Sequence, residues 1–391
     1  MLDRPLSLRR LVTALGRSPI TALLGPRQCG KTTLARLLSH RRTLHYFDLE
    51  DEADRSRLQN PALTLGAFRG LVVLDEVQRM PAMFEALRVL VDRPGHAAKY
   101  LLLGSASPAL VRGVSESLAG RVEFVELGGF DLAETGKESL ERLWTRGGFP
   151  RSFLARSDRD SLAWRESFIR TFLERDVPQL GLTIPAPAMR RFWTMLAHLH
   201  GQTWNASKLA RSMGLSDKTV RSYLDILTGT FLVRQLQPWH TNLAKRQVKA
   251  PRIYVRDSGV LHRLLGIDDR HGLLGHPQAG ASWEGFALEQ TLASIRPSEA
   301  YFWSTHGGAE LDLFFIRGGH RFGIEFKLTD APRVTRSMRV SLGDLELRHL
   351  WVIHAGNEHF PMEKTITAWP LREVPGLATR IDAASRRGAV V

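Results

Sequence analysis

Short apolar runs alternate with longer amphipathic stretches along the first 150 residues of the chain. Each run is four to six residues long, is rich in apolar side chains and lies between turn residues. A nearly continuous apolar run of this length is typical of a strand buried on both faces, so the pattern predicts a parallel sheet covered by helices. We expect the strands at 20–24, 44–49, 71–74, 100–103 and 122–127.

The pattern changes beyond residue 150. Residues 151–275 carry apolar side chains at helical spacing, and Pro185 and Pro187 interrupt this run. Residues 276–375 have mixed character, with a helix from about Ala281, three strands, another helix and a last strand. These strands are expected near 300–305, 310–316, 321–327 and 350–354, with hairpin turns at Gly307-Gly308 and Gly318-Gly319.

The length of 391 residues is enough for two to four domains at roughly 100–200 residues each. Hydrophobic residues make up 43% of the chain, which is enough to build cores rather than a disordered polymer. The patterns above divide the chain into a sheet domain of 1–150, a helical and helix-turn-helix region of 151–275, an α+β domain of 276–375, and a basic tail of 376–391 that is expected to fray.

The charge balance is basic, with 54 Lys and Arg against 40 Asp and Glu and a net charge of +14. Such a surface attracts polyanions, although an Arg-rich proteome would produce the same balance. No run approaches the roughly 18 apolar residues of a membrane span, and no signal-peptide core follows the N-terminus. The single cysteine, Cys29, excludes a disulfide framework and Cys-based zinc modules. We expect a cytoplasmic protein without membrane association, with DNA or RNA as a partner.

A glycine-containing turn follows the first expected strand and precedes a helical stretch that opens at Thr33. The segment Gly-Pro-Arg-Gln-Cys-Gly-Lys-Thr fits the phosphate-binding pattern G-x-x-x-x-G-K-[ST] in the strand–turn–helix context that the pattern requires. Loop amides would cradle phosphates, Lys31 would reach the β- and γ-phosphates, and Thr32 would hold Mg²⁺. The expected cofactors are ATP and Mg²⁺, bound by Gly25, Pro26, Arg27, Gln28, Cys29, Gly30, Lys31, Thr32 and Thr33.

A pair of acidic residues, Asp75 and Glu76, follows the apolar run at 71–74. Acidic side chains at the carboxyl end of a parallel strand face the ligand crevice. Asp75 is expected to bind Mg²⁺, and Glu76 to accept a proton from the attacking water. The extra strand between the loop and Asp75 indicates the P-loop class in which a catalytic Glu follows the metal-binding Asp.

Three residues near this site have two interpretations each. Ser105, after the strand at 100–103, either contacts the water or γ-phosphate or is a simple turn residue. Arg121 either contacts the γ-phosphate of its own or a neighbouring subunit, as an arginine finger does, or is a surface Arg of a basic protein. Cys29 lies inside the loop, but no base is near it in sequence, so we expect it to be tolerated there rather than nucleophilic.

Residues 205–227 have the pattern of a helix-turn-helix, with Gly214 at the turn and Ser216 as the N-cap of the second helix. Val220, Tyr223, Leu224 and Leu227 would face inward, and strands at 231–235 and 252–255 would form a wing. This motif serves either nucleic-acid contact or packing against protein. The candidate nucleic-acid contacts are Lys218, Arg221, Lys245 and Arg246.

Acidic residues also recur on the expected C-terminal strands. Glu325 and Lys327 share one strand face because side chains alternate, and Asp312 lies on the strand before them across a hairpin. Together with Glu284 on the preceding helix, these carboxylates would hold Mg²⁺ or Mn²⁺ for phosphodiester cleavage. The alternative is a charged edge hairpin in which Lys327 pairs with Glu325.

The chain resembles, over nearly its whole length, the bacterial and archaeal AAA-type ATPases fused to a domain of unknown function. The matching segments include GPRQCGKTT, LVVLDEVQRMP, LLLGSAS, SLAGR, FLERDV and KAPRIYVRDSGV. The C-terminal GAELDLFF…FGIEFK is similar to the PD-(D/E)XK nuclease superfamily, in which a helix Glu, an Asp and an E-x-K set form the active site. This resemblance assigns metal binding to Glu284, Asp312 and Glu325 and catalysis to Lys327.

The resemblance implies an α/β P-loop NTPase (AAA-type) with a parallel sheet, a helical and winged-helix region, and an α+β PD-(D/E)XK nuclease-like domain. It also implies a ring-like homo-oligomer, commonly a hexamer. The first functional hypothesis is an ATPase that couples hydrolysis to DNA or RNA cleavage. The alternative is a nucleotide-dependent assembly switch whose C-terminal domain only binds nucleic acid or a protein. A metabolite kinase is disfavoured because Asp75 and Glu76 suit attack by water.

Overall fold

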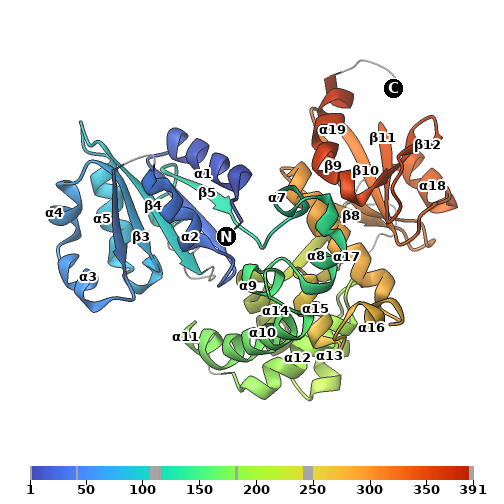
Figure 1. Ribbon diagram of the computed structural model, residues 1–391, viewed down its shortest axis with the longest axis horizontal. Coiled ribbons are helices and arrows are strands. Elements are labelled where there is room, and N and C mark those ends of the chain that lie inside the picture. The colour runs from blue at the N-terminus through green and yellow to red at the C-terminus, as the bar shows by residue number, and fades with distance from the viewer. Residues whose placement is uncertain are drawn as a thin grey trace. The chain divides into compact units, whose positions relative to one another are not determined.

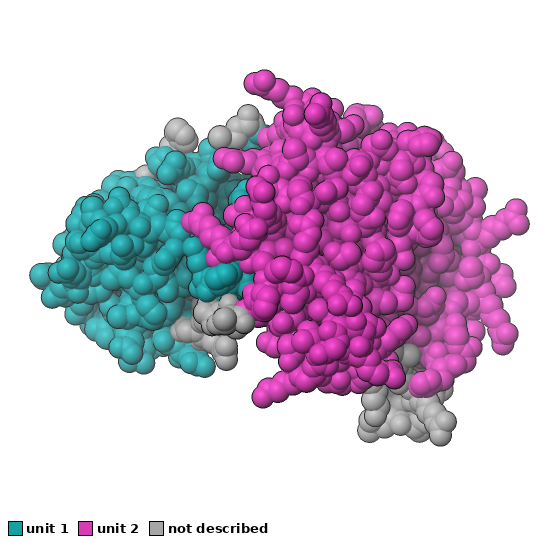
Figure 2. Space-filling model, turned by 90° about the horizontal axis from the view of Figure 1, so that it is seen from below, with its two compact units in different colours: residues 1–129, 177–182, 225–232 teal, residues 130–176, 183–224, 233–391 magenta. Residues whose placement is uncertain are grey.

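The computed structural model, drawn in Figure 1, describes residues 2–40, 43–105, 114, 116–180, 184–240 and 250–386. The chain forms two compact units, which Figure 2 distinguishes by colour. Unit 1 consists of residues 1–129, 177–182 and 225–232, and unit 2 of residues 130–176, 183–224 and 233–391. The segments 151–275 and 276–375, which the sequence pattern separates, therefore contribute mainly to the same unit.

Unit 1 contains a five-stranded parallel sheet, as the sequence predicts. The strand order is β2-β3-β4-β1-β5, so one strand separates β1 from β3. Because all strands run the same way, their carboxyl ends meet at one edge of the sheet. The strands are β1 (Ile20–Gly25), β2 (Leu44–Asp48), β3 (Gly70–Asp75), β4 (Ala98–Ser105) and β5 (Val122–Glu126).

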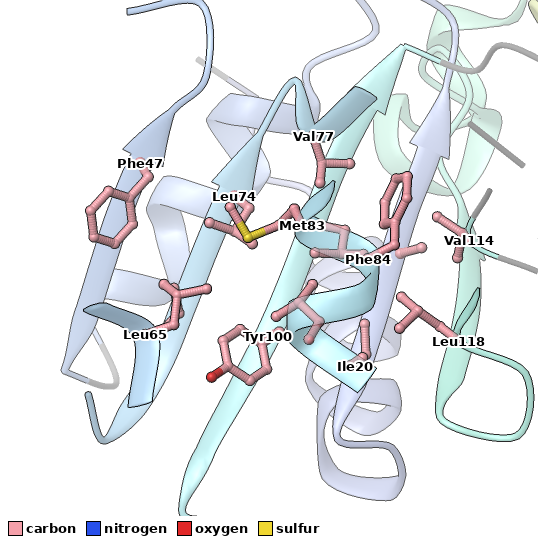
Figure 3. Close-up of a cluster of buried hydrophobic side chains, with 14 of the residues drawn as sticks. Ile20, Phe47, Leu65, Leu74, Val77, Met83, Phe84, Tyr100, Val114 and Leu118 are labelled. Carbon is pink, nitrogen blue, oxygen red and sulfur yellow. The ribbon is translucent and has the colours of Figure 1, made fainter. Parts of the chain in front are cut away.

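Helices cover the unit 1 sheet. Side chains of Ile20, Leu74 and Tyr100 meet Met83 and Phe84 of α5 (Ala82–Val91) in the core that Figure 3 shows. The alternate side chains of the same strands are also buried, and α1 (Pro5–Arg17) and α2 (Lys31–Arg36) contact β1. Burial on both faces explains the continuous apolar runs. The remaining helices are η1 (Leu37–His40), α3 (Glu52–Arg57), α4 (Pro61–Gly66), η2 (Val77–Arg79) and α11 (Val177–Gln179).

Unit 2 begins with a largely helical region. Pro187 lies in the first turn of α12 (Ala186–His198), where its missing N–H costs nothing, so the prolines begin a helix after the break. The long helix α14 (Asp217–Gly229) crosses from unit 2 into unit 1 after Leu224. The other helices are α7 (Leu132–Thr135), η3 (Lys137–Ser139), α8 (Leu140–Arg146), α9 (Pro150–Phe153), α10 (Asp158–Thr171), η4 (Phe172–Asp176), α13 (Ala206–Met213), α15 (Ser258–Leu264) and α16 (Arg270–Leu274).

An eight-stranded mixed sheet forms the rest of unit 2, in the order β12-β13-β11-β10-β9-β8-β6-β7. The expected turn Gly318-Gly319 joins β9 to β10, and both glycines have positive φ, as a tight hairpin requires. The strands are β6 (Val233–Pro238), β7 (Arg252–Val255), β8 (Tyr301–Ser304), β9 (Glu310–Arg317), β10 (His320–Lys327), β11 (His349–His354), β12 (Phe360–Glu363) and β13 (Ile366–Pro370). The helices are α17 (Ala279–Ile295), α18 (Arg336–Asp344), η5 (Leu371–Gly376) and α19 (Leu377–Arg386).

The strands expected at 231–235 and 252–255 are present as the antiparallel pair of β6 and β7. This pair belongs to the large sheet, because β6 also pairs with β8 and β7 lies at the edge. The expectation for the C-terminal tail was wrong. The expected frayed tail is helical as far as Arg386, because Leu377 and Ile381 on one face of α19 are buried and Arg317 forms an ion pair with Asp382 at 2.7 Å. Among the residues described, no helix is both long and apolar enough to cross a bilayer.

Two glycines of α17 provide a test of packing in unit 2. A Cβ at Gly285 would lie 2.0 Å from Nε2 of the buried His200, whereas nothing lies within 4 Å of a Cβ at Gly280. We expect Gly285→Ala to lower the free energy of unfolding by about 1–3 kcal/mol. The matched Gly280→Ala should raise it by up to about 1 kcal/mol through helix propensity. Urea unfolding measures both, and equal midpoints would contradict this packing.

Candidate functional site

The predicted phosphate loop connects β1 to α2 at the carboxyl edge of the unit 1 sheet. A Cβ at Gly25 would lie 2.0 Å from the Leu127 carbonyl oxygen, so only glycine fits there. Gln28 and Gly30 both have positive φ, which bends the loop back toward the helix. The Lys31 ammonium donates to the carbonyls of Gly25 and Pro26, each at 2.9 Å. Lys31 is thus buried, and its side chain folds back over the loop that precedes it.

The structure joins Thr32 of the loop to Asp75 at the end of β3. The Thr32 hydroxyl donates to Oδ2 of Asp75 at 2.9 Å, although the two residues are 43 positions apart. The same carboxylate oxygen accepts a hydrogen bond from the Tyr46 hydroxyl of β2. Burial and this carboxylate raise the pKa of Tyr46 far above its ordinary value, so the phenol stays a donor. Tyr46 was not among the predicted site residues, and its only signal in the sequence was its place in the neighbouring strand.

Glu76 follows Asp75 in a left-handed backbone conformation, with φ of 53°. This turn of the chain at the end of β3 is uncommon for a residue other than glycine and is often found at functional positions. Its carboxylate accepts a hydrogen bond from the side-chain amide of Gln78, which the sequence analysis also missed. Glu76 is only partly buried, so its side chain lies where water has access.

Arg4 is a further loop contact that the sequence did not reveal. Its guanidinium donates to the carbonyl of Cys29 at 3.0 Å and to those of Gly128 and Gly129 at 3.2 and 3.0 Å. The thiol of the buried Cys29 donates to the Leu127 carbonyl at 3.3 Å. Cys29 therefore has a packing role in the loop, and Arg4 ties the loop to the chain that leaves β5.

The other residues predicted around the phosphate loop are placed less uniformly. Ser105 ends β4 and pairs in register with Gly25, so its backbone lies at the loop edge. Arg27 donates to Gln179 at 2.7 Å, and Thr33 is exposed on α2. The backbone of Ser105 thus lies beside the loop, and Arg27 of the loop contacts Gln179. The exposed position of Thr33 indicates no contact with a ligand.

Arg121 lies at the opposite edge of the sheet. The register pairs Val122 with Ile20 and Glu126 with Leu24, so Arg121 precedes the amino end of β5 while the loop follows the carboxyl end of β1. Its guanidinium forms two hydrogen bonds with Asp92, at 2.8 and 2.7 Å. Five strand residues at about 3.3 Å each separate the two edges. The expectation that Arg121 reaches the γ-phosphate of its own subunit is therefore wrong.

The helix-turn-helix has the local structure that the sequence predicts. Gly214 is left-handed with φ of 68°, and the Ser216 hydroxyl accepts from the Thr219 amide at 3.1 Å. Val220, Tyr223, Leu224 and Leu227 are buried. Lys218 and Arg221 are exposed, while Lys245 and Arg246 lie outside the described residues.

The four C-terminal candidates converge in unit 2. Glu325 is buried and pairs with Lys327 at 3.0 Å. Asp312 is buried as well, and its Oδ2 accepts from the Phe326 amide at 3.0 Å. Glu284 of α17 accepts from the Tyr254 hydroxyl at 2.7 Å. The strand alternation and hairpin on which the prediction rested are thus present and bring Asp312, Glu325 and Lys327 together, while α17 adds Glu284.

The same cluster contains a cation that the sequence analysis did not place there. Arg252 of β7 is 7% exposed and lies 3.1 Å from Oδ1 of Asp312 and 3.8 Å from Oε1 of Glu284. Its other terminal nitrogen pairs with Glu310. Arg252 and Tyr254 alternate on the strand and so share the face that meets the carboxyl groups. The sequence signal for Arg252 was only this alternation of side chains in a strand that we expected to belong to the wing.

Burial and mutual repulsion shift the acidic groups toward their neutral forms. Burial and the Asp312 carboxylate raise the pKa of Glu284 to about 8 and that of Glu325 well above its ordinary value. Although burial opposes it, the Glu325 carboxylate raises the pKa of Lys327, which stays cationic. The cluster therefore combines two carboxyl groups whose neutral forms are favoured with two cations, Arg252 and Lys327.

The two predicted metal sites differ in chemistry. Within the described ranges, no group of three or more His, Cys, Asp or Glu side chains has an arrangement that holds a metal ion. The Thr32–Asp75 pair supplies one hydroxyl and one carboxylate, which fits Mg²⁺ because that ion takes few protein ligands and completes its shell with water and phosphate. The C-terminal cluster fits poorly, because Arg252 and Lys327 already contact its carboxyl groups.

Comparison with known proteins divides the chain into three matches. Residues 17–136 match the AAA domain, 137–271 a domain of unknown function (DUF8612) and 279–374 another domain of unknown function (DUF4143). The chain is 51% identical over 374 residues to Uncharacterized protein Rv2008c of Mycobacterium tuberculosis and to Uncharacterized protein Mb2031c of Mycobacterium bovis, covering 96% of this chain and 85% of each relative. A solved Walker-type ATPase of Pyrococcus abyssi is similar at 16% identity, with 68% of this chain and 96% of that chain covered and a TM-score of 0.49.

The contacts of Arg4 predict a role in shaping the loop. Arg4→Met leaves the carbonyls of Cys29, Gly128 and Gly129 without this donor, and we expect it to lower the free energy of unfolding by about 1–3 kcal/mol. It should also weaken binding of a fluorescent ATP analogue about tenfold. The matched control is Arg9→Met, which changes an exposed arginine of α1, the helix that follows Arg4. Equal affinity for the two variants would show that Arg4 does not shape the loop.

Proposed function

This chain belongs to the family of the two mycobacterial proteins, and with that membership and its AAA domain as the premise we propose that it is a Mg²⁺-dependent ATP hydrolase. The observation that carries the proposal is the 2.9 Å hydrogen bond between Thr32 and Asp75. It joins the two halves of a nucleotide site from segments distant in sequence. A chance glycine turn would give no such partner.

The residues of unit 1 have distinct roles in this proposal. Lys31 would exchange its carbonyl contacts for contacts with the β- and γ-phosphates, and Thr32 and Asp75 would hold Mg²⁺, whose charge would offset that of the phosphates. Tyr46 keeps the Asp75 carboxylate oriented through its hydrogen bond. Glu76 accepts the proton of the attacking water, and Gln78 positions its carboxylate.

Two substitutions separate binding from turnover. Lys31→Ala removes the charge that reaches the phosphates, so we expect loss of ATP binding by at least about tenfold. Glu76→Gln should retain binding and slow hydrolysis by about 10²–10⁴, because an amide does not accept the proton. Phosphate release and nucleotide affinity measure both effects. The control is Glu85→Gln, an exposed residue on α5; unchanged hydrolysis by Glu76→Gln would refute the assignment of the base.

We further propose that the ATPase forms a homo-oligomer that acts on nucleic acid. The net charge of +14 and the exposed Lys218 and Arg221 support nucleic acid as the partner. The position of Arg121, remote from its own loop, leaves a neighbouring subunit as the place where it would act as an arginine finger. A ring in which each Arg121 meets the next subunit's loop accommodates this geometry.

The C-terminal domain supports two versions of this function. The convergence of Glu284, Asp312, Glu325 and Lys327 favours metal-dependent cleavage. The cations that already contact these carboxyl groups favour the alternative, in which ATP controls assembly and the domain binds without cutting. We propose the second version, because a metal ion at this place would have to displace Arg252 and Lys327 from carboxyl groups that they already contact, and such an ion needs several oxygen ligands at once.

A binding and cleavage assay tests this version. We expect labelled DNA or RNA to bind with a steep salt dependence and to remain uncut with Mg²⁺, Mn²⁺ and ATP. The double variant Lys218→Ala/Arg221→Ala should flatten the slope of log affinity against log salt by about one to two. The control Arg333→Ala/Lys364→Ala removes two exposed charges elsewhere in unit 2. Metal-dependent cutting that Asp312→Asn abolishes would instead establish the nuclease.

A further inference from the structure

Arg252, Glu284, Asp312, Glu325 and Lys327 form a cluster of mostly buried charged groups in unit 2. The inference from it rests on the proposed function in which the C-terminal domain binds without cutting. We propose that Arg252 is an internal cation that occupies the place between Asp312, Glu310 and Glu284 and closes the cluster to divalent metal ions. The strand β7 thereby acts as a plug in a site whose residue types are otherwise those of a metal centre.

The contacts of the guanidinium support this role. One terminal nitrogen lies 3.1 Å from Asp312 and 3.8 Å from Glu284, and the other pairs with Glu310. The guanidinium also lies over the ring of Phe302, with 4.8 Å between its carbon and the ring centre. Four groups thus hold one side chain, which is far more than a surface arginine has. The guanidinium stays protonated at any pH the protein experiences, so its charge is permanent.

The carboxyl oxygens nearest the guanidinium already have partners. Asp312 accepts from Arg252 on one oxygen and from the Phe326 amide on the other. Oε1 of Glu284 accepts a hydrogen bond from the hydroxyl of Tyr254, which lies on the same strand as Arg252. Glu325 contacts Lys327 through Oε2, and its buried Oε1 has no hydrogen-bond partner among the described residues. A divalent ion at the place of the guanidinium needs several oxygen ligands at once, so it would have to displace Arg252 from both Asp312 and Glu310.

A second ionic contact fixes the plug in place. Glu289 of α17 pairs with Arg256, just beyond β7, at 3.1 Å and also with Arg234 of β6. Although burial opposes it, the two arginines lower the pKa of Glu289 to about 2, so this contact persists at all ordinary pH values. Arg252 therefore enters the cluster from a strand pair that is itself held against α17, rather than from a free loop.

Manganese binding to the full-length, nucleotide-free protein tests the plug directly. The electron paramagnetic resonance signal of free Mn²⁺ measures binding. We expect the wild type and the Asp312→Asn variant to bind the same amount of Mn²⁺. Arg252→Gln should gain one site per chain, at least tenfold tighter than any wild-type binding, and Asp312→Asn in that background should abolish it. The control Arg333→Gln, which removes an exposed arginine elsewhere in unit 2, should gain none.

Stoichiometric Mn²⁺ binding by the wild type that Asp312→Asn abolishes would overturn the inference. So would a folded Arg252→Gln variant that gains no site. If Arg252→Gln fails to fold by circular dichroism, the comparison of wild type with Asp312→Asn still decides. Because nucleotide is absent, the result does not depend on ATP hydrolysis. A protein that binds Mn²⁺ at Asp312 yet cuts nothing would end the plug and leave the non-cleaving function intact.

Discussion

The shared direction of the five strands in unit 1 is the constraint on which the nucleotide site depends. Parallel strands end at one edge, so the loop after β1, Asp75 after β3 and Ser105 after β4 meet there despite their separation in sequence. The hydrogen bond from Thr32 to Asp75 then links two elements between which another strand lies. If one strand ran the other way, its terminal residue would lie at the far edge, as Arg121 does.

The buried cations of the two units have different kinds of partner. In unit 1, Lys31 donates to backbone carbonyls, which it can exchange for phosphate because neither carbonyl carries a net charge. In unit 2, the buried Arg252 contacts Asp312 and Glu310, and removing these partners would leave its charge buried and unpaired. The first arrangement suits a site that binds and releases an anion. The second suits a fixed structural contact.

Contacts outside the recognisable motifs complete the nucleotide site. Tyr46 holds the oxygen of Asp75 that also meets Thr32, and Gln78 holds Glu76. Arg4 connects the loop to Gly128 and Gly129, where the chain leaves unit 1. Arg4 therefore holds the loop and the residues that follow β5 together.

The sequence alone determined the parallel sheet, the phosphate loop, the acidic pair after β3 and the helix-turn-helix, because each depends on local periodicity or on a motif with fixed spacing. It also placed Glu325 and Lys327 on one face through strand alternation. Only the tertiary structure decided that β6 and β7 extend the large sheet, that Arg121 lies far from its own loop, and that Arg252 enters the carboxylate cluster. These depend on which strands become neighbours, and no short-range pattern encodes the partner of an edge strand or the charge that a distant segment brings.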